Sequence, residues 1–575
     1  MVDLRADVNR DGVVDLSPGA ADDVDEDTWD ATHGAVFLAN IDDDQKQCPY
    51  SNQLSDVQLA KCNDAADEVI NGDDDLLDLA WLKSVPWPQA PDTATATVTV
   101  TLGTEQYVRL FRESDGALLD FAPGTTLDAA ALRSGLVLAI EARDIVRDTA
   151  KWDGYVDVSL TVSTAPGTPS NQILTDTVRL RVSPVMLFHH LEKAETVFVT
   201  DAKGDPDSPK FQADIVAAAN AAGTANPVYK VYLNRGYPDQ WTQDFFENGY
   251  MAMPAPDGQQ HVIRVAYRSA NIYHNSTSNP LRDYGRIVYL LRGKDVAAVQ
   301  EYDLKSDPSM DTLNSFGNTE IIPPYTLGDE SFPLGRLFRG SVPSFHPDKA
   351  FSKMLESQKV QPPVYVDTSW LLVGHVDETF TFLKVNSPRG WIVLVNDPAL
   401  ARQMLEAEVA KGNGDVTMFK GQYWYDDNFD PYPAEVSIND VLADADVMNE
   451  SASAAVEVAA QLDIVRGATG ITDAEIVRVP YLHEPFDGYS VAYQPGTANM
   501  LVLSDSVVAV PDPHGPEIGN VDIFKKQMED ALAPYGYTIR WVDDWNLYHA
   551  LSGEVHCGTN AARSIPEQRW WESGR

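Results

Sequence analysis

The chain has 575 residues, too many for a single hydrophobic core, so we expect two or three domains of ~100 to 250 residues each. It carries 86 acidic and 43 basic residues, and the net charge of -43 repels nucleic acid phosphates and anionic lipid surfaces. No apolar run approaches the ~20 residues of a membrane-spanning helix. Nucleic acid and membranes are therefore not expected as partners. The charge favours calcium or arginine- and lysine-bearing substrates, and acidity that serves only solubility is the alternative.

Acidic loops dominate the first 90 residues, with DVNRDGVVD at 7–15, NIDDDQ at 40–45 and DEVINGDDDLLD at 67–78. Such clusters repel themselves unless a cation lies among them. Asp7, Asn9, Asp11 and Gly12 have the offsets of the first half of an EF-hand loop, but its twelfth position is Pro18, so no glutamate closes it. For this loop, a calcium site and a solvated acidic turn are equal alternatives.

Cysteine occurs only three times, at Cys48, Cys62 and Cys557. Pairing of the first two would leave one free thiol, a pattern compatible with export, but the spacing leaves the pairing open. The first residues, MVDLRADVNRDG, lack the apolar segment of a signal peptide. We expect an exported protein whose signal peptide is not part of this sequence, with a cytoplasmic protein as the alternative.

Apolar and polar residues alternate in the sequence from 93 to about 185. Examples are TATATVTVTL at 93–102, YVDVSLTVST at 155–164 and TVRLRVSPVMLF at 177–188. This period of two predicts strands of an antiparallel sandwich with one solvated face.

Strand-like runs separated by helical segments follow from about 190 onwards. The runs are GRIVYLLRG at 285–293, GWIVLVN at 390–396 and NMLVLSDSVVAVP at 499–511. The segments 208–223, 398–412 and 520–536 have apolar spacing near 3.6 and a glycine at or beyond the end, which predicts helices. We therefore expect an α+β protein of two domains, an all-β domain over 1–188 and an α/β domain over 189–575.

Three segments of the second region offer the parts of a cysteine-dependent active site. DQWTQDFFENGY places Trp241 near Asp244, an apolar wall beside a carboxylate. SWLLVGHVDETF is predicted as a strand, so that His375 and Asp377 project from the same face. GEVHCGTN contains Cys557. A thiol, an imidazole and two carboxylates suit attack on a guanidinium carbon better than on a peptide carbonyl, whose developing negative charge the carboxylates would repel. For each fragment taken alone, the simpler interpretation is a hydrogen-bonded polar residue in the core.

Six motifs occur in the order and approximate spacing of one known family: QWTQDFFENGY, NSFGNTEIIPP, FPLGRLF, LLVGHVDETF, NMLVL, and GEVHCGTN followed by RWW. In these segments the chain resembles the protein-arginine deiminases. The resemblance is densest from about 228 to 571 and looser before 190.

The resemblance implies a fold. Residues 1–188 would form the family's immunoglobulin-like middle domain with acidic calcium-binding loops, and 189–575 an α/β-propeller (pentein) domain of the guanidino-modifying superfamily. It also implies that the additional N-terminal domain of vertebrate members is missing.

The resemblance further implies roles for individual residues. Cys557 matches the nucleophile, His375 the general acid and base, and Asp244 and Asp377 the carboxylates that bind the guanidinium. Trp241 matches a wall of the substrate pocket. The implied activity is calcium-dependent conversion of protein arginine to citrulline and ammonia through a covalent S-alkylthiouronium.

Calcium is the implied cofactor, at two places. One family site matches Gln243, Glu247, Phe316, Thr319 and Glu320. A second, looser match to the middle-domain cluster involves Asn40, Asp42, Asp44, Asp67, Glu68, Asp75 and Asp78. Salt bridges and solvated turns are the plain alternatives at both places.

This sequence also departs from the family. Phe245 and Tyr267 stand where acidic ligands of a further calcium site are expected, so we expect that site to be lost. Ile272 stands near the position of an arginine that holds the substrate backbone, and Arg268 is the candidate replacement. The expected substrates are arginine-containing proteins or peptides; the alternatives are free arginine or a small guanidine, or an inactive calcium-binding protein. Both monomer and homodimer remain open.

Overall fold

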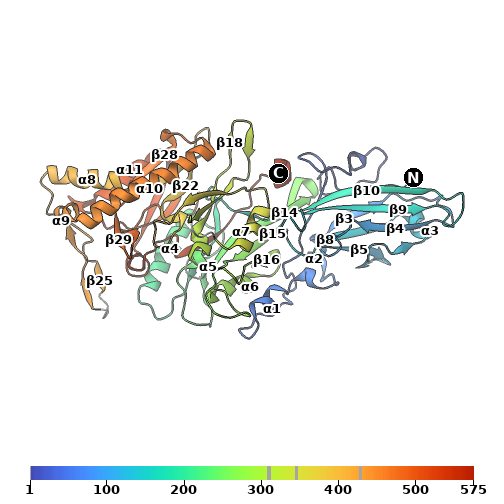
Figure 1. Ribbon diagram of the computed structural model, residues 1–575, viewed down its shortest axis with the longest axis horizontal. Helices are drawn as coiled ribbons and strands as arrows, with labels where there is room; N and C mark the ends of the chain where they lie inside the picture. Colours follow the sequence, from blue (N-terminus) through green and yellow to red (C-terminus); the bar gives the residue numbers. More distant parts are fainter. Residues whose placement is uncertain (1, 307–311, 344–346, 426–429) are drawn as a thin grey trace.

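The computed structural model describes residues 2–306, 312–343, 347–425 and 430–575 (Figure 1). The molecule is elongated. A part built from N-terminal strands forms one end, the long helix α10 (Ala445–Thr469) lies towards the other, and the C-terminus returns to the middle (Figure 1). Among the described residues, no helix has the length and apolar character that crossing a membrane requires.

Two five-stranded sheets face each other in the N-terminal part. The first sheet consists, in spatial order, of β1 (Leu4–Ala6), β3 (Ala80–Ser84), β8 (Val137–Ala142), β5 (Val108–Ser114) and β6 (Ala117–Asp120). The second consists of β2 (Ala35–Phe37), β10 (Ile173–Val182), β9 (Tyr155–Ser163), β4 (Thr95–Val100) and β7 (Thr126–Leu127).

The predicted alternation over 93–102 and 155–164 is confirmed. Every second residue of β9 is buried, from Val156 to Val162, and the residues between them are only partly covered. On the outer face, hydroxyl groups of β9 and β10 pair across the strands, as between Ser159 and Thr177 at 2.8 Å. The period of two therefore sorts the strands into an apolar inner face and a polar outer face.

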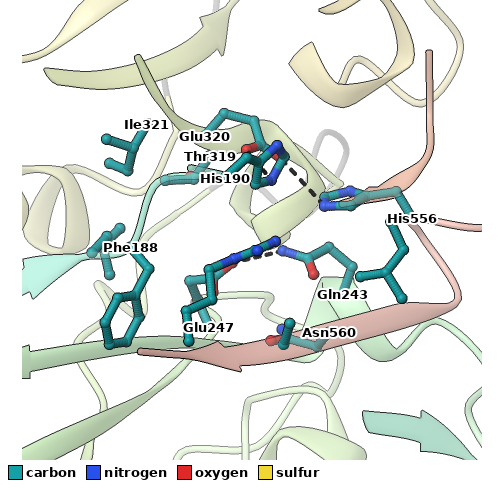
Figure 2. Close-up of a pocket in the computed structure, with 13 residues that line it drawn as sticks. Phe188, His190, Gln243, Glu247, Thr319, Glu320, Ile321, His556 and Asn560 are labelled. Carbon is teal, nitrogen blue, oxygen red and sulfur yellow. Dashed lines mark hydrogen bonds and ion pairs between the residues drawn. The ribbon is translucent and has the colours of Figure 1, made fainter. Parts of the chain in front are cut away.

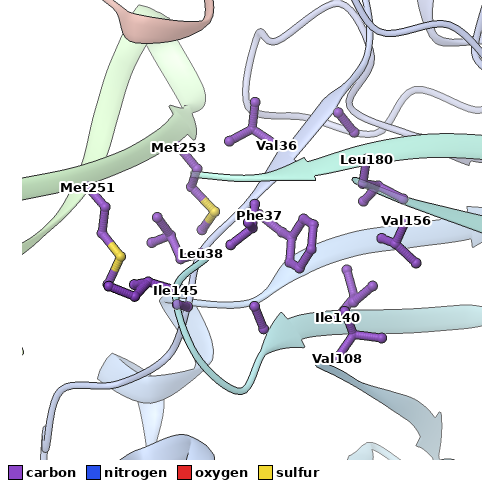
Figure 3. Close-up of a cluster of buried hydrophobic side chains, with 14 of the residues drawn as sticks. Val36, Phe37, Leu38, Val108, Ile140, Ile145, Val156, Leu180, Met251 and Met253 are labelled. Atoms are coloured by element: carbon purple, nitrogen blue, oxygen red, sulfur yellow. The ribbon is translucent and has the colours of Figure 1, made fainter. Parts of the chain in front are cut away.

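The core of this sandwich continues into the rest of the chain. Phe37 and Val156 from one sheet and Ile140 from the other contribute to a single cluster that also includes Met251 and Met253 (Figure 3). Both methionines belong to β14 (Phe246–Ala255), outside the sandwich. The sandwich thus packs directly against the part of the chain that carries the predicted active-site residues.

Five small sheets form the framework of the remaining chain, and each combines antiparallel pairing with one parallel pair. Their strands are β13 (Tyr229–Val231), β12 (Ala194–Thr200) and β36 (Thr559–Arg563); β11 (Met186–Leu187), β14, β15 (Gln259–Arg268) and β16 (Val296–Val299); β17 (Thr319–Ile322), β20 (Arg336–Ser341) and β21 (Val364–Asp367); β22 (Phe380–Lys384), β23 (Trp391–Asp397) and β28 (Ile476–Pro480); and β31 (Leu501–Val502), β32 (Val507–Pro511) and β35 (Thr538–Val542).

Helical segments join the two parallel strands in every one of these five sheets, as a parallel connection requires. They are α4 (Ser208–Ala222), α6 (Ile287–Leu291), α7 (Lys349–Ser357), the group α8 (Pro398–Ala410), α9 (Ile438–Ala443) and α10, and α11 (Ile523–Leu532). Gly223 ends α4 in the left-handed conformation with φ +64°, which fits the glycine predicted at that end.

Short helices and hairpins complete the described chain. The helices are α1 (Asp56–Ala60), α2 (Asp73–Leu77), α3 (Ala129–Ser134) and α5 (Thr242–Phe245). The hairpins pair β18 (Tyr325–Leu327) with β19 (Glu330–Phe332), β24 (Thr417–Met418) with β27 (Val436–Ser437), β25 (Tyr423–Tyr425) with β26 (Pro431–Pro433), β29 (His483–Phe486) with β30 (Tyr489–Ala492), and β33 (Glu517–Ile518) with β34 (Val521–Asp522).

The element predicted at 285–293 is wrong. The run GRIVYLLRG at 285–293 was expected as a strand, but 287–291 form α6. A short apolar run bounded by glycines has the same composition in a buried strand and in a buried helix, so periodicity cannot separate them. The helices predicted at 208–223, 398–412 and 520–536 are confirmed as α4, α8 and α11, the last one shorter at both ends.

The end of the chain returns to its beginning. Strand β36 pairs antiparallel with β12, the first strand of the second part. The following RWW segment docks on the sandwich: the Trp570 ring stacks on Trp29 at 5.7 Å, and its indole N–H donates to the Ala252 carbonyl at 2.7 Å. This closure brings the predicted segment around Cys557 against strands that lie far away in sequence.

Candidate active site

Cys557 lies in the turn that leads into β36, and it is buried. Its Sγ is 3.5 Å from Asn499 Oδ1 and 3.9 Å from Asp377 Oδ2. Asn499 Oδ1 also accepts hydrogen bonds from the backbone N–H groups of His556, at 3.0 Å, and Cys557, at 3.3 Å. The amide of Asn499 therefore fixes the turn that carries the thiol.

His375 and Asp377 lie in a different local structure from the one predicted. The strand expectation for this segment is wrong, because 376–378 form a turn of 3₁₀-helix. Gly374 precedes it at φ +81°, and the Glu378 carboxylate accepts from the backbone N–H of His375 at 2.8 Å. This cap starts the helical turn and turns both side chains towards the same buried space.

The tautomer of His375 follows from its partners. Nε2 lies 2.8 Å from the carbonyl oxygen of Thr312, which can only accept, so Nε2 carries the proton. Nδ1 has no hydrogen-bond partner among the described residues and lies 3.9 Å from Asp244 Oδ1. The nitrogen that faces the carboxylate is therefore the one free to accept a proton.

A glycine makes room for this arrangement. A Cβ atom on Gly317 would lie 2.5 Å from His375 Nδ1 and 3.0 Å from Asp377 Oδ2. Both side chains thus press against the same backbone position in the SFGN segment. A larger residue there would displace the imidazole or the carboxylate.

Asp244 lies in α5 and is buried together with a cation of the chain itself. Its Oδ2 accepts from Arg282 Nη1 at 3.1 Å, while Oδ1 has no hydrogen-bond partner within the described part of the chain. Arg282 is held in turn by Asp239 through two hydrogen bonds of 2.6 and 2.9 Å. One oxygen of Asp244 is therefore already paired, and the other is free.

Trp241, just before α5, is partly buried and forms a wall against the cysteine segment. A Cβ atom on Gly553 would lie 2.2 Å from its ring. The ring also meets Tyr548 edge-on at 5.5 Å. The first glycine of GEVHCGTN is thus required by the close approach of the indole.

Burial governs the protonation of the site. Burial, and then the carboxylates of Asp377 and Asp244, raise the pKa of the Cys557 thiol well above its ordinary value. Burial also raises the pKa of Asp244, against the lowering effect of Arg282 and His375. Burial raises the pKa of Glu378 to about 8, although its hydrogen bond from the His375 backbone opposes the rise. The thiol is therefore protonated in the free protein at neutral pH.

Four of the five predicted ligands of the first metal site line one pocket: Gln243, Glu247, Thr319 and Glu320 (Figure 2). Phe316 is not among the lining residues; its ring packs edge-on against Phe351 at 5.5 Å. His190 and His556 line the same pocket, and neither was predicted.

The donors of this pocket fit a divalent cation. Oε1 of Glu320 is buried without a hydrogen-bond partner, and burial raises the pKa of Glu247 to about 7. The pocket touches the active site through Gln243, whose backbone N–H donates to the Cys557 carbonyl at 3.1 Å, and through His556, which precedes Cys557. An ion bound here would therefore act directly on the segment that carries Asp244.

Most of the predicted N-terminal acids are brought together and buried. Considering the described residues, oxygens without hydrogen-bond partners remain on three acids and one amide: Asp42 Oδ1, Asp44 Oδ2, Asp78 Oδ2 and Asn40 Oδ1. Burial, then the neighbouring carboxylates, raise the pKa of Asp42 to about 10 and that of Asp78 to about 9. Buried carboxylates with free oxygens and no counter-charge are the donors that calcium prefers.

The structure does not bring Glu68 to this cluster. Asp67 and Glu68 are exposed, and Asp67 accepts locally from the Val69 backbone N–H at 2.8 Å. In their place stand residues that were not predicted. Asp64 is buried nearby, and His261 Nε2 lies 2.6 Å from Asp78 Oδ1.

The N-terminal cluster also lies at the junction of the sandwich with the rest of the chain. The backbone N–H of Asp295, which precedes β16, donates to Asp42 Oδ2 at 3.0 Å. His261 belongs to β15. An ion in this cluster would therefore tie the two parts together.

Backbone N–H groups of the loop 7–15 donate hydrogen bonds to the carboxylates of Asp7 and Asp22. Both oxygens of Asp7 accept backbone N–H groups, from Asp11 and Gly12, at 2.9 Å. Those of Asp22 accept from Val8 at 3.1 Å and from Asp15 at 2.8 Å. These contacts favour the acidic turn over a calcium loop.

Two of the expected departures are buried core residues. Phe245 and Tyr267 are fully covered and belong to apolar clusters. Arg268 does not reach the site. Its guanidinium is buried, pairs with Asp56 at 2.8 Å and donates to the carbonyl oxygens of Leu281 and Arg282. The guanidinium of Arg268 therefore pairs with groups inside the protein and is not available to bind a substrate.

Several residues of the site were missed from the sequence. Asn499, Gly317 and His556 lie inside the quoted motifs NMLVL, NSFGNTEIIPP and GEVHCGTN, so the motifs themselves were the signal. Arg282 and His190 lie in no quoted motif. Their contacts with Asp244 and Glu320 depend on chain closure, which spacing does not reveal.

Comparisons with known proteins agree with the motifs. The sequence model of the protein-arginine deiminase (PAD) family matches residues 172–572. Protein-arginine deiminase type-1 of Homo sapiens is 30% identical over 429 residues, which cover 72% of this chain and 60% of that protein. The type-4 protein of Rattus norvegicus is 26% identical over 591 residues, covering 99% and 82%.

Among solved structures, agmatine deiminase of C. jejuni matches with a TM-score of 0.32 and 10% identity, over 67% of this chain and 98% of that one. The match to human type-1 spans three fifths of that relative's length. The family match itself extends over more than half of the present sequence. This chain belongs to the protein-arginine deiminase family.

Proposed function

We propose that this chain hydrolyses the guanidinium group of arginine residues in proteins to the ureido group of citrulline, with release of ammonia. The observation that supports this most is the approach of four groups from three distant segments. Cys557 Sγ lies 3.9 Å from Asp377 Oδ2, and His375 Nδ1 lies 3.9 Å from Asp244 Oδ1. Two carboxylates beside a thiol suit a planar cation whose N–H groups pair with carboxylates.

The first half of the reaction breaks a C–N bond. The Cys557 proton passes to His375 Nδ1, and the thiolate sulfur forms a bond to the guanidinium carbon. His375 then gives its proton to the departing nitrogen, and ammonia leaves. The product is a covalent S-alkylthiouronium on Cys557.

The second half reverses the proton movement. His375 Nδ1 takes a proton from a water molecule, whose oxygen bonds to the same carbon. The C–S bond then breaks as the new hydroxyl group becomes the carbonyl of citrulline, and the hydroxyl proton returns to the Cys557 sulfur. His375 releases the other proton to the solvent, and citrulline leaves. The hydrogen bond from Nε2 to the Thr312 carbonyl keeps Nδ1 directed at the reacting groups throughout.

The substrate activates its own nucleophile in this scheme. Burial and two carboxylates hold the Cys557 thiol in its protonated form when no substrate is bound. A guanidinium between Asp244 and Asp377 would offset part of the negative charge of the two carboxylates and lower the pKa of the thiol. Deprotonation would then be coupled to binding of a cation.

Arg282 sets a condition on that binding. It already donates to Asp244 Oδ2, so a substrate guanidinium would pair with the free Oδ1 or displace Arg282 towards Asp239. The observed space beside Cys557 is about 20 Å³, room for about one water molecule. Binding therefore requires movement of side chains near α5.

Calcium is the cofactor that we propose. Gln243, Glu247, Thr319 and Glu320 would hold one ion, and the buried acids around Asp42 another. Bound calcium would supply positive charge that offsets the buried carboxylates and orders the segments carrying them. The free oxygens of Glu320 and Asp42 support this assignment.

For the fold, we propose that the sandwich is of the immunoglobulin-like class and that the five small sheets are the blades of an α/β-propeller. The boundary would fall between residues 188 and 189. The support is the repeated order of strands and crossover helices and the pairing of the last sheet strand with the first.

Export is also proposed, since Cys48 and Cys62 form a disulfide and Cys557 is a free thiol.

Free arginine or a small guanidine is the alternative substrate class, and an inactive calcium-binding protein the alternative function. Ammonia release from a peptide with blocked termini and from free arginine, each with calcium and with excess chelator, separates these cases. The proposal expects release from the peptide that depends on calcium. Release from free arginine alone, or from neither compound, would overturn it.

A further inference from the structure

The pocket next to the active site contains nitrogen donors as well as oxygen donors. His190 precedes β12, Glu320 lies in β17, and His556 immediately precedes Cys557. All three are buried, and their donor atoms lie within 4.8 Å of one another. Figure 2 shows the three side chains directed at the same point. Segments that are distant in the sequence thus build one cluster.

The distances from each histidine to the Glu320 carboxylate are close to the ligand separations of a first-row metal site. His190 Nε2 lies 3.1 Å from Glu320 Oε2, and His556 Nε2 lies 3.5 Å from Glu320 Oε1. A tetrahedral zinc ion with bonds of about 2.0–2.2 Å places its ligand atoms about 3.3–3.6 Å apart. Small side-chain adjustments would therefore bring all three groups to bonding distance.

The neighbouring space can hold one ion. The cavity amounts to about 20 Å³, which is about one water molecule. Glu247 and Gln243 line its other side and leave a position for a carboxylate or a water as the fourth ligand. Among the described residues, Oε1 of Glu320 accepts no hydrogen bond and is near only the His556 imidazole, at 3.5 Å, so it can still take a ligand bond.

One histidine is already oriented as a metal ligand. His556 Nδ1 donates to Asp377 Oδ2 at 2.8 Å, which leaves Nε2 towards the pocket. A carboxylate behind the second ring nitrogen is the usual device that fixes the tautomer of a metal-bound histidine. Here that carboxylate is Asp377, which also lies next to Cys557.

The donor set separates this site from a calcium site. Calcium takes six to eight oxygen ligands, whereas two imidazole nitrogens and a carboxylate favour zinc and its first-row neighbours. Gln243, Glu247 and Thr319 offer oxygen donors to the same pocket to which His190 and His556 offer nitrogen donors. Glu320 belongs to both sets.

We propose that His190, His556 and Glu320 form a binding site for a first-row transition metal, with Zn²⁺ as the ion to test. Zinc and calcium would compete at this pocket for Glu320. The competition rests on the proposed calcium site, but zinc binding does not. Since the same metal ion would hold His556, it would also hold Asp377 beside the thiol.

The test measures binding without substrate. Metal-free full-length protein is titrated with Zn²⁺ by calorimetry and with Co²⁺ by visible absorption. His190→Asn should weaken Zn²⁺ binding roughly tenfold or more, because even loss of an outer partner of a ligand costs about 10- to 100-fold. His189→Asn is the matched control, since His189 is also buried but lies beside Glu192, and it should bind Zn²⁺ like the wild type.

Two further variants exclude other sites. Cys557→Ser removes the neighbouring thiol, and His261→Asn removes the histidine of the cluster with Asp78 and Asp295. Both should retain wild-type Zn²⁺ affinity. Loss of binding in either variant, or unchanged binding in His190→Asn, would overturn the proposal.

If His190→Asn fails to fold, the Co²⁺ spectrum of the wild-type protein tests the site instead. A Co²⁺ spectrum with imidazole and carboxylate ligands and without thiolate charge-transfer bands is expected. Thiolate bands, or no Co²⁺ and Zn²⁺ binding at all, would refute the site. Added calcium should weaken Zn²⁺ binding. If Zn²⁺ binds equally well with and without calcium, the two ions do not share Glu320, and that part of the proposal is wrong. This outcome does not depend on the protein's activity on arginine.

Discussion

The Nδ1–H of His556 donates to Oδ2 of Asp377 over 2.8 Å, and the same oxygen lies 3.9 Å from the sulfur of Cys557. The pocket lined by His556 and the thiol thus share one carboxylate. This contact fixes Asp377 before any substrate arrives and couples its position to the occupancy of the neighbouring pocket.

Asp377→Asn should lower kcat/KM for an arginine peptide roughly 10- to 100-fold, because a hydrogen bond to a charged group contributes about 1.5–3 kcal/mol. Steady-state kinetics on purified protein measures the change. Asp505→Asn, at an exposed turn between β31 and β32, is the control and should be neutral. Equal kinetics for both variants would remove Asp377 from the site.

Gly317→Ala should abolish most activity while the protein stays folded. Its new Cβ would lie 2.5 Å from His375 Nδ1, so the imidazole must leave its position. Gly467→Ala is the matched control, since nothing lies within 4 Å of that Cβ and the site is in helix α10. Citrulline formation and thermal unfolding are measured together. An active Gly317→Ala protein would show that the observed place of His375 is not the working one.

The disulfide between Cys48 and Cys62 should stabilise the folded protein. Opening a loop of this length costs about 3 kcal/mol in the chain-entropy account. The loop also carries Asp56, which pairs with Arg268 and Arg286 at 2.8 Å each, so its release would loosen a buried contact with the second part of the chain. The double variant Cys48→Ser/Cys62→Ser should unfold at lower denaturant concentration. An unchanged midpoint would contradict the stabilising role.

Glu26 makes stability depend on pH. Burial, and then the neighbouring Asp176 carboxylate, raise the pKa of Glu26 from its ordinary 4.5 to about 9. The folded protein therefore holds a proton that the unfolded chain releases, so this contribution to stability is complete below pH 4.5 and is lost as the pH rises through 9.

Glu26→Gln should remove that dependence, and its stability advantage over the wild type should grow between pH 5 and pH 9. Denaturant unfolding at several pH values measures this difference. Glu113→Gln, at an exposed position in β5, is the control and should show a constant difference. A Glu26→Gln advantage that shrinks as the pH rises would contradict the assigned proton.

The sequence predicted the parts of the site better than their surroundings. Cys557, His375, Asp244 and Asp377 could be named because each lies in a specific motif, and the alternation of β9 shows directly which face is buried. The strand expected around His375 failed because the cap from Glu378 and the glycine before it override the apolar pattern.

Residues joined only by tertiary structure could not be predicted. The pairing of Arg282 with Asp244 and the meeting of His190 with Glu320 depend on how distant segments close upon one another. Arg268 was expected to bind substrate because it lies near the matching sequence position, but its guanidinium pairs with Asp56 in the interior. Charge and spacing do not show which partner a buried guanidinium takes.

The most direct test of the central claim is mass spectrometry of an arginine-rich protein after incubation with this chain and calcium. The account predicts citrulline at arginine positions, none with Cys557→Ala, and suppression by excess chelator that calcium reverses. Citrulline formed equally by Cys557→Ala, in a preparation free of other deiminases, would contradict it, as would a folded, calcium-loaded wild type that leaves every arginine intact.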